Sequence, residues 1–245
     1  MTRYNLKYDI IFPVLNEETR LPNGIEKIID FLKSIEMENF SITIADNGSV
    51  DRTKTVADAL AAKNPKIKSI SVGKKGLGLA LKTAWNQSDA DVVGYMDVDL
   101  ATDLTHFQEV VYFFETNNGD FINGSRNLAS SIVKNRSPIR TLTSIGYNKI
   151  LQAFLNVNFT DGMCGFKFLR NSVYRRLSNL GAKNDGLFFC TELLYFAEKN
   201  GIFIQEIPVR WTDDRDSRVK LIKTIFYYLR EIFMLLFKIK RRNKD

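Results

Sequence analysis

The sequence predicts an α/β fold with a largely parallel mixed sheet flanked by helices. Short apolar runs suited to buried strands alternate with amphipathic patterns over the first 116 residues, which is typical of strands joined by crossover helices. Polar loops directly follow three of these runs, which end at Phe12, Ala45 and Met96. Because ligands of open α/β sheets bind outside the carboxyl ends of the strands, the three loops predict a single crevice.

The expected elements follow this alternation in order along the chain. Strands are expected near 8–13, 41–45, 67–72 and 91–96, and helices near 23–36, 52–63, 78–88 and 103–116. After residue 119 the rhythm changes: 139–155 carries a second amphipathic pattern, and 202–207 is a last strand ended by Pro208. We find no repeat, low-complexity stretch or linker. We therefore expect one folded domain over 1–218, followed by an amphipathic basic helix and tail over 219–245.

Composition fits an ordinary folded domain. With 245 residues, of which 44% are hydrophobic, the chain is long enough to bury a substantial core. The two cysteines, Cys164 and Cys190, form no Cys-x-x-Cys pair and lie apart from the single histidine, His106. Neither a disulfide framework nor cysteine chemistry is expected. Residues 1–7 lack the apolar stretch of a signal peptide, so we expect the chain to stay on the cytosolic side.

The positive charge is concentrated at the C-terminal end. The formal net charge is +7, and residues 215–245 hold ten Lys/Arg against three Asp/Glu, which accounts for the whole excess. The segment also carries an apolar stripe at the spacing of one helix face, formed by Leu221, Ile222, Ile225, Phe226, Leu229, Ile232, Phe233, Leu236 and Ile239. Arg230 and Glu231 interrupt this stripe, whereas a spanning helix needs about 20 apolar residues.

We interpret the segment as a helix in a membrane interface. Its basic end would lie at anionic headgroups, with Lys238, Lys240, Arg241, Arg242 and Lys244. The alternative is a helix packed on the body with a solvated basic end, because both kinds of helix show the same periodicity. Basic charge also permits nucleic-acid binding, but no recognition motif accompanies it. We therefore expect a membrane surface and no nucleic acid as partner.

The pair Asp97-Val98-Asp99 ends the apolar run over 92–96. Alternate side chains of a strand share one face, so this spacing aims both carboxylates the same way. Hard oxygen ligands suit Mg²⁺ or Mn²⁺ carrying a diphosphate. Read alone, the pair also fits an acidic surface turn, and its neighbouring motifs decide between the two interpretations.

The acidic pair belongs to an ordered set of motifs. The set PVLNE, DNGSVDRT, GLGLA, DVDLAT, GSR and DGMCGFK resembles the inverting family-2 glycosyltransferases, which have the GT-A fold. Within that family, DVDLAT, KNRSPIRTL, CGFKFL, ELLYFAEKNGI and PVRWTDDRDSRVK are most similar to the branch of dolichyl- or polyprenyl-phosphate glucosyltransferases and dolichyl-phosphate mannose synthases. The resemblance extends from Tyr8 to about Phe237.

The resemblance implies a nucleotide-sugar site at the strand ends. Its residues would be Pro13, Leu15, Glu17, Asp46, Asn47, Lys75, Gly76, Asp97, Val98 and Glu192. Asp99 is the best ligand for Mg²⁺ or Mn²⁺, while Asp97 supports the metal or the ribose. Two positions depart from the family, since Asn47 replaces a common aspartate and Ala101 replaces a glutamine found in many synthases of the branch. The charges at 16–18 also fit the start of a helix.

The glycines after the third expected strand do not indicate a dinucleotide site. The spacing of Gly73, Gly76 and Gly78 is not G-x-G-x-x-G, and a dinucleotide motif would follow the first strand. A hydride-transfer fold is therefore disfavoured. We expect a close backbone passage at a helix start, with Lys74 or Lys75 near phosphate.

Arginines dominate the motifs expected on the acceptor side. By resemblance, the contacts to an acceptor phosphate fall on Arg126, Arg136, Arg140, Arg215, Ser217 and Arg218, and guanidinium forks suit phosphate. The last motif departs from the family's Gly-Ser-Lys because it reads Asp216-Ser217-Arg218. The charge is kept there, while the loop backbone differs.

The resemblance places Asp161 and Arg126 at the reacting centre together with Asp99. A lipid phosphate is already an anionic nucleophile, whereas a hydroxyl acceptor needs a carboxylate to take its proton. Asp161 would orient the sugar, act as that base, or brace the turns at Gly162 and Gly165. These alternatives stay open from the sequence.

We therefore expect an enzyme that transfers a hexose, with glucose favoured, from a nucleotide sugar, with UDP favoured, to polyprenyl or dolichyl phosphate at the cytosolic membrane face. The alternative is a family-2 glycosyltransferase that extends a glycan or another hydroxyl acceptor. A nucleotidyltransferase that makes the sugar nucleotide is more remote, because its glycine-rich loop after the first strand is replaced by PVLNEE. A homo-oligomer or a membrane-protein partner is compatible with each of these functions.

Overall fold

A computed structural model describes residues 4–116, 119–213 and 221–242, with the backbone alone at 221–225 and 240–242. Its strands are β1 (Tyr8–Val14), β2 (Phe40–Asp46), β3 (Ile67–Ser71), β4 (Val92–Met96), β5 (Phe121–Ser125), β6 (Ile132–Lys134), β7 (Phe166–Arg170), β8 (Ile204–Pro208) and β9 (Arg210–Thr212). Its helices are α1 (Leu21–Ser34), α2 (Thr53–Lys63), α3 (Leu77–Gln87), α4 (His106–Thr116), α5 (Pro138–Leu155), α6 (Asn171–Leu180), α7 (Phe189–Lys199) and α8 (Leu221–Arg242).

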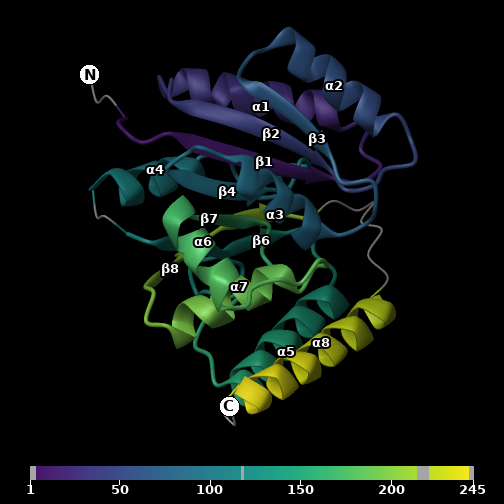
Figure 1. Cartoon of the computed structure of the whole chain (residues 1–245), viewed down its shortest axis with the longest axis vertical. Coiled ribbons are helices and arrows are strands. Elements are labelled where there is room, and N and C mark those ends of the chain that lie inside the picture. Colours follow the sequence, from purple (N-terminus) through teal and green to yellow (C-terminus); the bar gives the residue numbers. More distant parts are fainter. Residues whose placement is uncertain (1–3, 117–118, 214–220, 243–245) are drawn as a thin grey trace.

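In the described residues, a seven-stranded sheet has the order β3-β2-β1-β4-β7-β5-β8, and β6 pairs with β9 in a small second sheet (Figure 1). The neighbours β1, β2, β3 and β4 are parallel, whereas β7 runs antiparallel to both β4 and β5. The predicted α/β fold with a largely parallel mixed sheet is thus confirmed.

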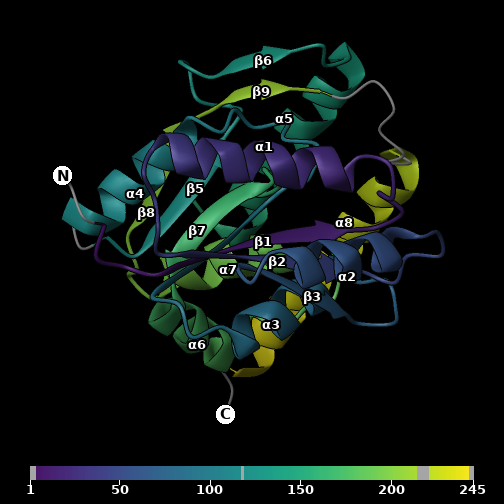
Figure 2. The same cartoon turned by 90° about the horizontal axis from the view of Figure 1, so that it is seen from above.

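Helices cover both faces of the sheet and enclose two hydrophobic clusters (Figure 2). On one face α1, α2 and α4 pack against β1 and β2, and α1 does so through Leu21, Ile25, Ile28 and Leu32. On the other face α3, α6 and α7 contribute to the second cluster, together with α5 and α8. Because both faces are covered, β1, β2 and β4 are buried along almost their whole length, including the polar Asp9, Ser41 and Thr43.

The expected elements of the first half agree with the structure to within about three residues, including the strands at 8–14, 40–46, 67–71 and 92–96. The amphipathic pattern at 139–155 is α5. The last predicted strand is β8, and it extends through Pro208 instead of stopping before it. The strands β5, β6, β7 and β9 and the helices α6 and α7 were not predicted.

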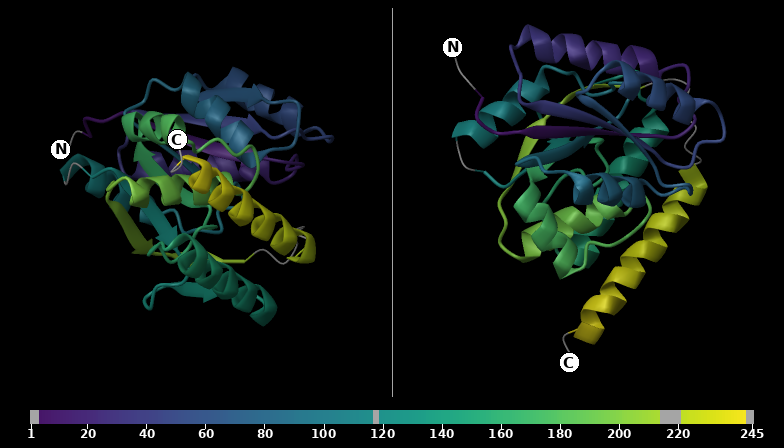
Figure 3. Two further views of the ribbon diagram at one scale, coloured as in Figure 1. Left: turned by 60° about the horizontal axis from the view of Figure 1, so that its bottom comes forward. Right: turned by 45° about the horizontal axis from the view of Figure 1, so that its top comes forward.

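The helices α5 and α8 lie side by side at one end of the molecule (Figures 1 and 3). The rings of Tyr147 and Tyr228 join them, with centroids 4.6 Å apart. The predicted apolar stripe of α8 is divided between two surfaces. Ile232 is buried against the body, as is Tyr228 outside the stripe, whereas Phe226 and Phe233 are each 70% exposed. In the part of the chain that the structure describes, no helix is long and apolar enough to cross a membrane.

Candidate active site

The parallel arrangement brings the loops after β1, β2 and β4 to one edge of the sheet. The amino end of β7 and the carboxyl end of β5 meet the same edge, because β7 is antiparallel to both β4 and β5. The predicted site residues of these loops therefore come together. Their charges act on one another: burial and the charges of Asp99 and Glu17 raise the pKa of Asp97, whereas the charges of Arg126 and Lys167 lower it.

The loops after β1 and β2 brace one another. The amide of Asn16 donates to Ser49 Oγ at 2.9 Å, and the amide of Glu17 donates to Thr53 Oγ1 at 2.7 Å. The buried carboxylate of Asp46 accepts from the amide of Ser49 at 3.0 Å and from the Ser71 hydroxyl at 2.8 Å. These contacts fix the backbone of the predicted nucleoside pocket, to which Pro13 and Leu15 belong as partly buried residues.

The glycines at the start of α3 make the expected close backbone passage, with a later segment of the same chain as the neighbour. The amide of Gly78 donates to Gly186 O at 3.2 Å, and that of Leu79 donates to Asp185 O at 3.0 Å. The amide of Gly76 donates to the side-chain oxygen of Asn47. The close backbone passage is therefore made by the turn at 184–186, and these three N–H groups are already occupied. Residues 74 and 75 are exposed beside them.

The acidic pair lies in a turn instead of a strand. The strand β4 ends at Met96, and the amide of Leu100 donates to the carbonyl of Asp97 at 3.0 Å. The strand rule used for the prediction is thus wrong here. Asp97 is half-buried while Asp99 is exposed, and burial together with the charge of Asp99 raises the pKa of Asp97 to about 7. The intervening Val98 is buried, with its carbonyl against Gly24 of α1.

Two carboxylates suffice for a cation that arrives with a diphosphate. Among residues 4–116, 119–213 and 221–242 no cluster of three or more His, Cys, Asp or Glu is placed to hold a metal. Mg²⁺ usually keeps several waters and uses one or two protein carboxylates plus substrate phosphates. The Asp97 and Asp99 pair meets that requirement. Asp97 is also held in place tightly, since a Cβ at Gly165 would lie 1.9 Å from its Oδ2.

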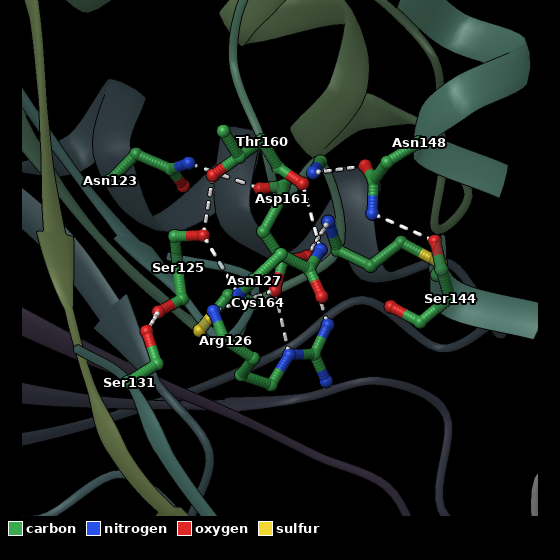
Figure 4. A network of polar contacts seen from close by, with 12 residues as sticks. Asn123, Ser125, Arg126, Asn127, Ser131, Ser144, Asn148, Thr160, Asp161 and Cys164 are labelled. Atoms are coloured by element: carbon green, nitrogen blue, oxygen red, sulfur yellow. Dashed lines mark hydrogen bonds and ion pairs between the residues drawn. The ribbon is translucent and has the colours of Figure 1, made fainter. Parts of the chain in front are cut away.

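Arg126 and Asp161 form a buried ion pair at the end of β5 (Figure 4). The Arg126 guanidinium donates to both carboxylate oxygens, at 2.7 and 2.9 Å, and its backbone amide adds a third contact at 3.1 Å. The amide of Met163 donates to Oδ1 of Asp161 at 3.0 Å. Burial alone would raise the pKa of Asp161, but the Arg126 charge lowers it to about 2. So acidic a carboxyl group is poorly suited to take a proton near neutral pH.

The turn that carries Asp161 is held from several directions (Figure 4). Asn123 donates to the Asp161 carbonyl at 3.0 Å, and the amide of Gly162 donates to Asn148 Oδ1 of α5 at 2.9 Å. Lys167 is fully buried, and its Nζ donates to the carbonyl of Cys164 at 2.7 Å. The geometry thus fits the bracing role considered for Asp161.

Two of the arginines predicted for the acceptor side, Arg126 and Arg136, lie beside the ring of Trp211 in β9. The Cζ atoms of Arg126 and Arg136 lie 5.3 and 5.5 Å from the centre of its ring. Within the described residues, Arg136 Nε and Trp211 Nε1 are buried and donate no hydrogen bond. Burial and the charge of Arg126 lower the pKa of Arg136. Arg140 instead pairs with Asp213 at 3.1 Å.

Not every predicted residue faces this centre. The carboxylate of Glu192 is buried and accepts from the amides of Lys183 and Asn184 at 2.9 and 2.7 Å. The structure therefore places Glu192 under the turn that contacts α3. The predicted contacts at 215, 217 and 218 lie outside the described residues, as do the side chains at 221–225 and 240–245.

Sequence reasoning missed Trp211, Lys167 and Asn148. Lys167 could have been found, because it stands between two phenylalanines in β7 and a charge buried in a strand needs a specific partner. Trp211 lies within the motif PVRWTDDRDSRVK, of which only the arginines and Ser217 were considered as site residues. Asn148 had no local signal, since its partner Gly162 follows in a separate loop.

The comparison with known protein families decides the class of protein. The family described as "Glycosyl transferase family 2" matches residues 9–178, which is more than half of the chain. The chain belongs to glycosyltransferase family 2. The matched region includes the loops after β1, β2 and β4 and the Arg126 and Asp161 pair, so a glycosyltransferase site is expected at this edge of the sheet.

Relatives of this glycosyltransferase carry related names. Glycosyltransferase AglD of Haloferax volcanii is 29% identical over 226 residues, which cover 91% of this chain and 36% of that protein. The chain thus spans about a third of the length of AglD. Dolichyl-phosphate beta-glucosyltransferase ALG5A of Trichomonas vaginalis is 30% identical over 226 residues, covering 86% of this chain and 68% of that protein.

A solved structure supports the GT-A fold of the glycosyltransferase. Glucosyl-3-phosphoglycerate synthase from Mycobacterium tuberculosis, in complex with Mn²⁺ and uridine-diphosphate-glucose, superposes with a TM-score of 0.66 at 13% identity. The match covers 94% of this chain and 80% of that chain. At this identity the likeness concerns the fold, and the predicted GT-A architecture is confirmed.

Proposed function

We propose that this glycosyltransferase moves a hexose, with glucose favoured, from a nucleotide sugar, with UDP favoured, to polyprenyl or dolichyl phosphate, with inversion at the anomeric carbon. The observation that carries the proposal is the acceptor side, where Arg126 and Arg136 lie beside the ring of Trp211 and where both carboxylate oxygens of Asp161 are bound by Arg126. Relatives named dolichyl-phosphate beta-glucosyltransferase support the same acceptor.

The donor would lie across the ends of β1, β2 and β4. Asp46 and the loop after β1 would hold the nucleoside, and the segment at 75–76 would border it. Asp99 and Asp97 would hold Mg²⁺ or Mn²⁺ at the diphosphate, where a divalent cation supplies charge neutralisation for the leaving group. The pKa of Asp97, raised to about 7, would fall on metal binding, because a carboxylate must be deprotonated to serve as a ligand.

The acceptor would approach the opposite side of the anomeric carbon. A phosphate oxygen forms the new bond to that carbon while the bond to the donor diphosphate breaks, and the diphosphate keeps the electron pair. Near neutral pH a phosphate monoester is largely doubly ionised, since its second pKa is about 6, and no protein base is needed. Arg136 would hold this phosphate directly, while Arg126, already paired with Asp161, would contribute its charge and fix the turn.

The membrane would be met by α5 and α8. On α5 the side chains of Ile139 and Leu142 are 69% and 73% exposed, and Ile139 directly precedes Arg140. On α8 the exposed apolar side chains alternate with the exposed, basic Arg230 and Lys238. Such a surface suits a peripheral position on anionic lipid, which would present the acceptor phosphate next to Arg136. We place the catalytic domain at 1–218 and the interface helix and tail at 219–245, on the cytosolic face.

The proposal is tested by incubating the purified protein with UDP- and GDP-sugars, Mn²⁺ and polyprenyl phosphate, and identifying the lipid product by mass. Polyprenol, the same lipid with a hydroxyl in place of the phosphate, is the matched control. We expect product with the phosphate alone. Product with polyprenol, or with a sugar acceptor only, would move the function to hydroxyl acceptors.

A variant separates the two substrates. Arg136→Ala removes a charge-assisted contact of about 1.5–3 kcal/mol, so the KM for polyprenyl phosphate should rise by roughly ten- to a hundredfold while donor affinity stays unchanged. Arg175→Ala, an exposed arginine of α6, is the control and should match the wild type. Equal acceptor KM values for both variants would remove Arg136 from the acceptor site.

A further inference from the structure

The start of α3 rests on a turn that lies about a hundred residues further along the chain. Gly78 and Leu79 donate their amides to the carbonyls of Gly186 and Asp185. A Cβ at Gly78 would lie 2.2 Å from the carbonyl oxygen of Asn184. The turn at Asn184–Gly186 therefore sets where the backbone of α3 begins.

The same turn is held in place by α8. Asn184 Nδ2 donates to Glu231 Oε2 at 2.7 Å, and the Tyr227 hydroxyl donates to Asn184 Oδ1 at 3.1 Å. The Tyr227 oxygen also accepts from the amide of Phe188 at 3.3 Å. A Cβ at Gly186 would lie 2.2 Å from that oxygen. Two side chains of α8 thus fix the position of Asn184 and of the turn around it.

On the other side, the start of α3 reaches the donor pocket. The amide of Gly76 donates to the side chain of Asn47, which is buried beside Asp46 at the end of β2. The backbone amide of Asn47 donates to the carbonyl of Val14 at the end of β1 at 2.8 Å. A continuous series of hydrogen bonds therefore runs from α8 through 184–186 and 76–79 to the ends of β1 and β2.

We propose that Tyr227 and Glu231 of α8 are positioning residues for the donor side of the active site. They hold Asn184, which holds the start of α3 beside Asn47. The inference rests on the proposed function in taking residues 75–76 as the border of the nucleotide-sugar site. It adds that the helix whose outer face would meet lipid also fixes the donor pocket through its inner face, so release of α8 from the body would weaken donor binding.

The test measures donor binding in full-length variants by calorimetry, with UDP and Mn²⁺ and without acceptor. Tyr227→Phe and Glu231→Ala each remove contacts to the turn and should weaken UDP binding by roughly three- to tenfold, while the KM for the acceptor stays unchanged. Glu231→Gln keeps a carbonyl that accepts from Asn184 and should bind within about twofold of the wild type. Arg230→Ala, on the exposed face of the same helix, is the control for UDP binding, which is measured without lipid.

A second measurement needs no nucleotide. Hydrogen exchange of the amides of Gly78 and Leu79 should be faster in Tyr227→Phe and Glu231→Ala than in the wild type and in Arg230→Ala. Unchanged exchange in Tyr227→Phe, which removes a single oxygen and should fold, overturns the inference. If the wild type binds no nucleotide, the proposed function fails, and the exchange rates still decide whether α8 positions the start of α3.

Discussion

Replacing Asp161 with asparagine should both destabilise the protein and change how its stability depends on pH. Asp161 is fully buried and Arg126 nearly so, with side chains 0% and 8% exposed. The fall of the Asp161 pKa to about 2, from about 4 in an unfolded chain, corresponds to roughly 2.5 kcal/mol. Since the variant also leaves a buried guanidinium unpaired, which typically costs about 3–5 kcal/mol, we expect a loss of about 3 kcal/mol.

Urea unfolding at several pH values measures this loss. The Asp161 carboxylate has a lowered pKa, so its contribution is fully present above about pH 4 and disappears as the pH falls towards 2. The difference between wild type and Asp161→Asn should therefore be largest at pH 7 and shrink below pH 4. At pH 7 the Tm should fall by about 6–12 °C.

Asp89→Asn is the control, because Asp89 pairs with Lys7 at the surface, where the side chains are 72% and 42% exposed. Such an exposed pair is screened by solvent and contributes little to stability. If Asp161→Asn stays within about 0.5 kcal/mol of the wild type at pH 7, or if its deficit does not depend on pH, the ion pair is not the stabilising contact inferred here.

Three further predictions concern the metal and the membrane surface. Asp99→Asn should lower turnover by roughly a hundredfold or more, and a chelator should have the same effect on the wild type; full turnover in metal-free buffer would contradict this. Gly165→Ala should displace the Asp97 carboxylate and weaken Mn²⁺-dependent UDP binding, measured by calorimetry, whereas metal-free UDP binding should change little. Phe233→Ala should weaken binding to anionic vesicles by roughly tenfold with an unchanged Tm, while Ile232→Ala should cost about 2–5 kcal/mol of stability and leave vesicle binding of the folded protein intact; the reverse pattern would mean that α8 presents its other face.

The first half of the fold was predictable because its signals are local. The strands β1 to β4 each carry at least two large apolar residues, each is followed by a helix, and polar loops follow β1, β2 and β4. The second half was harder to predict. Lys167 interrupts the apolar pattern of β7, and its burial is compensated by a hydrogen bond to the carbonyl of Cys164, which the pattern does not reveal. In addition, α6 begins at Asn171, directly after β7, so no loop separates the strand from the helix in the sequence.

The site was predictable in its residue types and less so in their roles. The motifs identified Asp97, Arg126 and Asp161, but the low pKa of Asp161 depends on an arginine 35 positions earlier in the chain. The glycines at the start of α3 were expected to allow a close backbone passage, but the motif could not identify the backbone near residue 185 as the neighbour. Such roles depend on tertiary contacts that a sequence motif does not contain.

The antiparallel strand β7 sets the distance between the ends of β4 and β5, where the proposed donor and acceptor sides lie. Its amino end lies between the carboxyl ends of β4 and β5, so the backbones at Asp97, proposed for the metal side, and at Arg126, proposed for the acceptor side, are two strand spacings apart, about 10 Å. Loop changes cannot alter this span while the sheet stays paired. A shift of β7 by one position would turn Lys167 to the opposite face of the sheet. Because this spacing is fixed, substrates of different size would have to be accommodated by the side chains at the strand ends and by the helices outside the sheet.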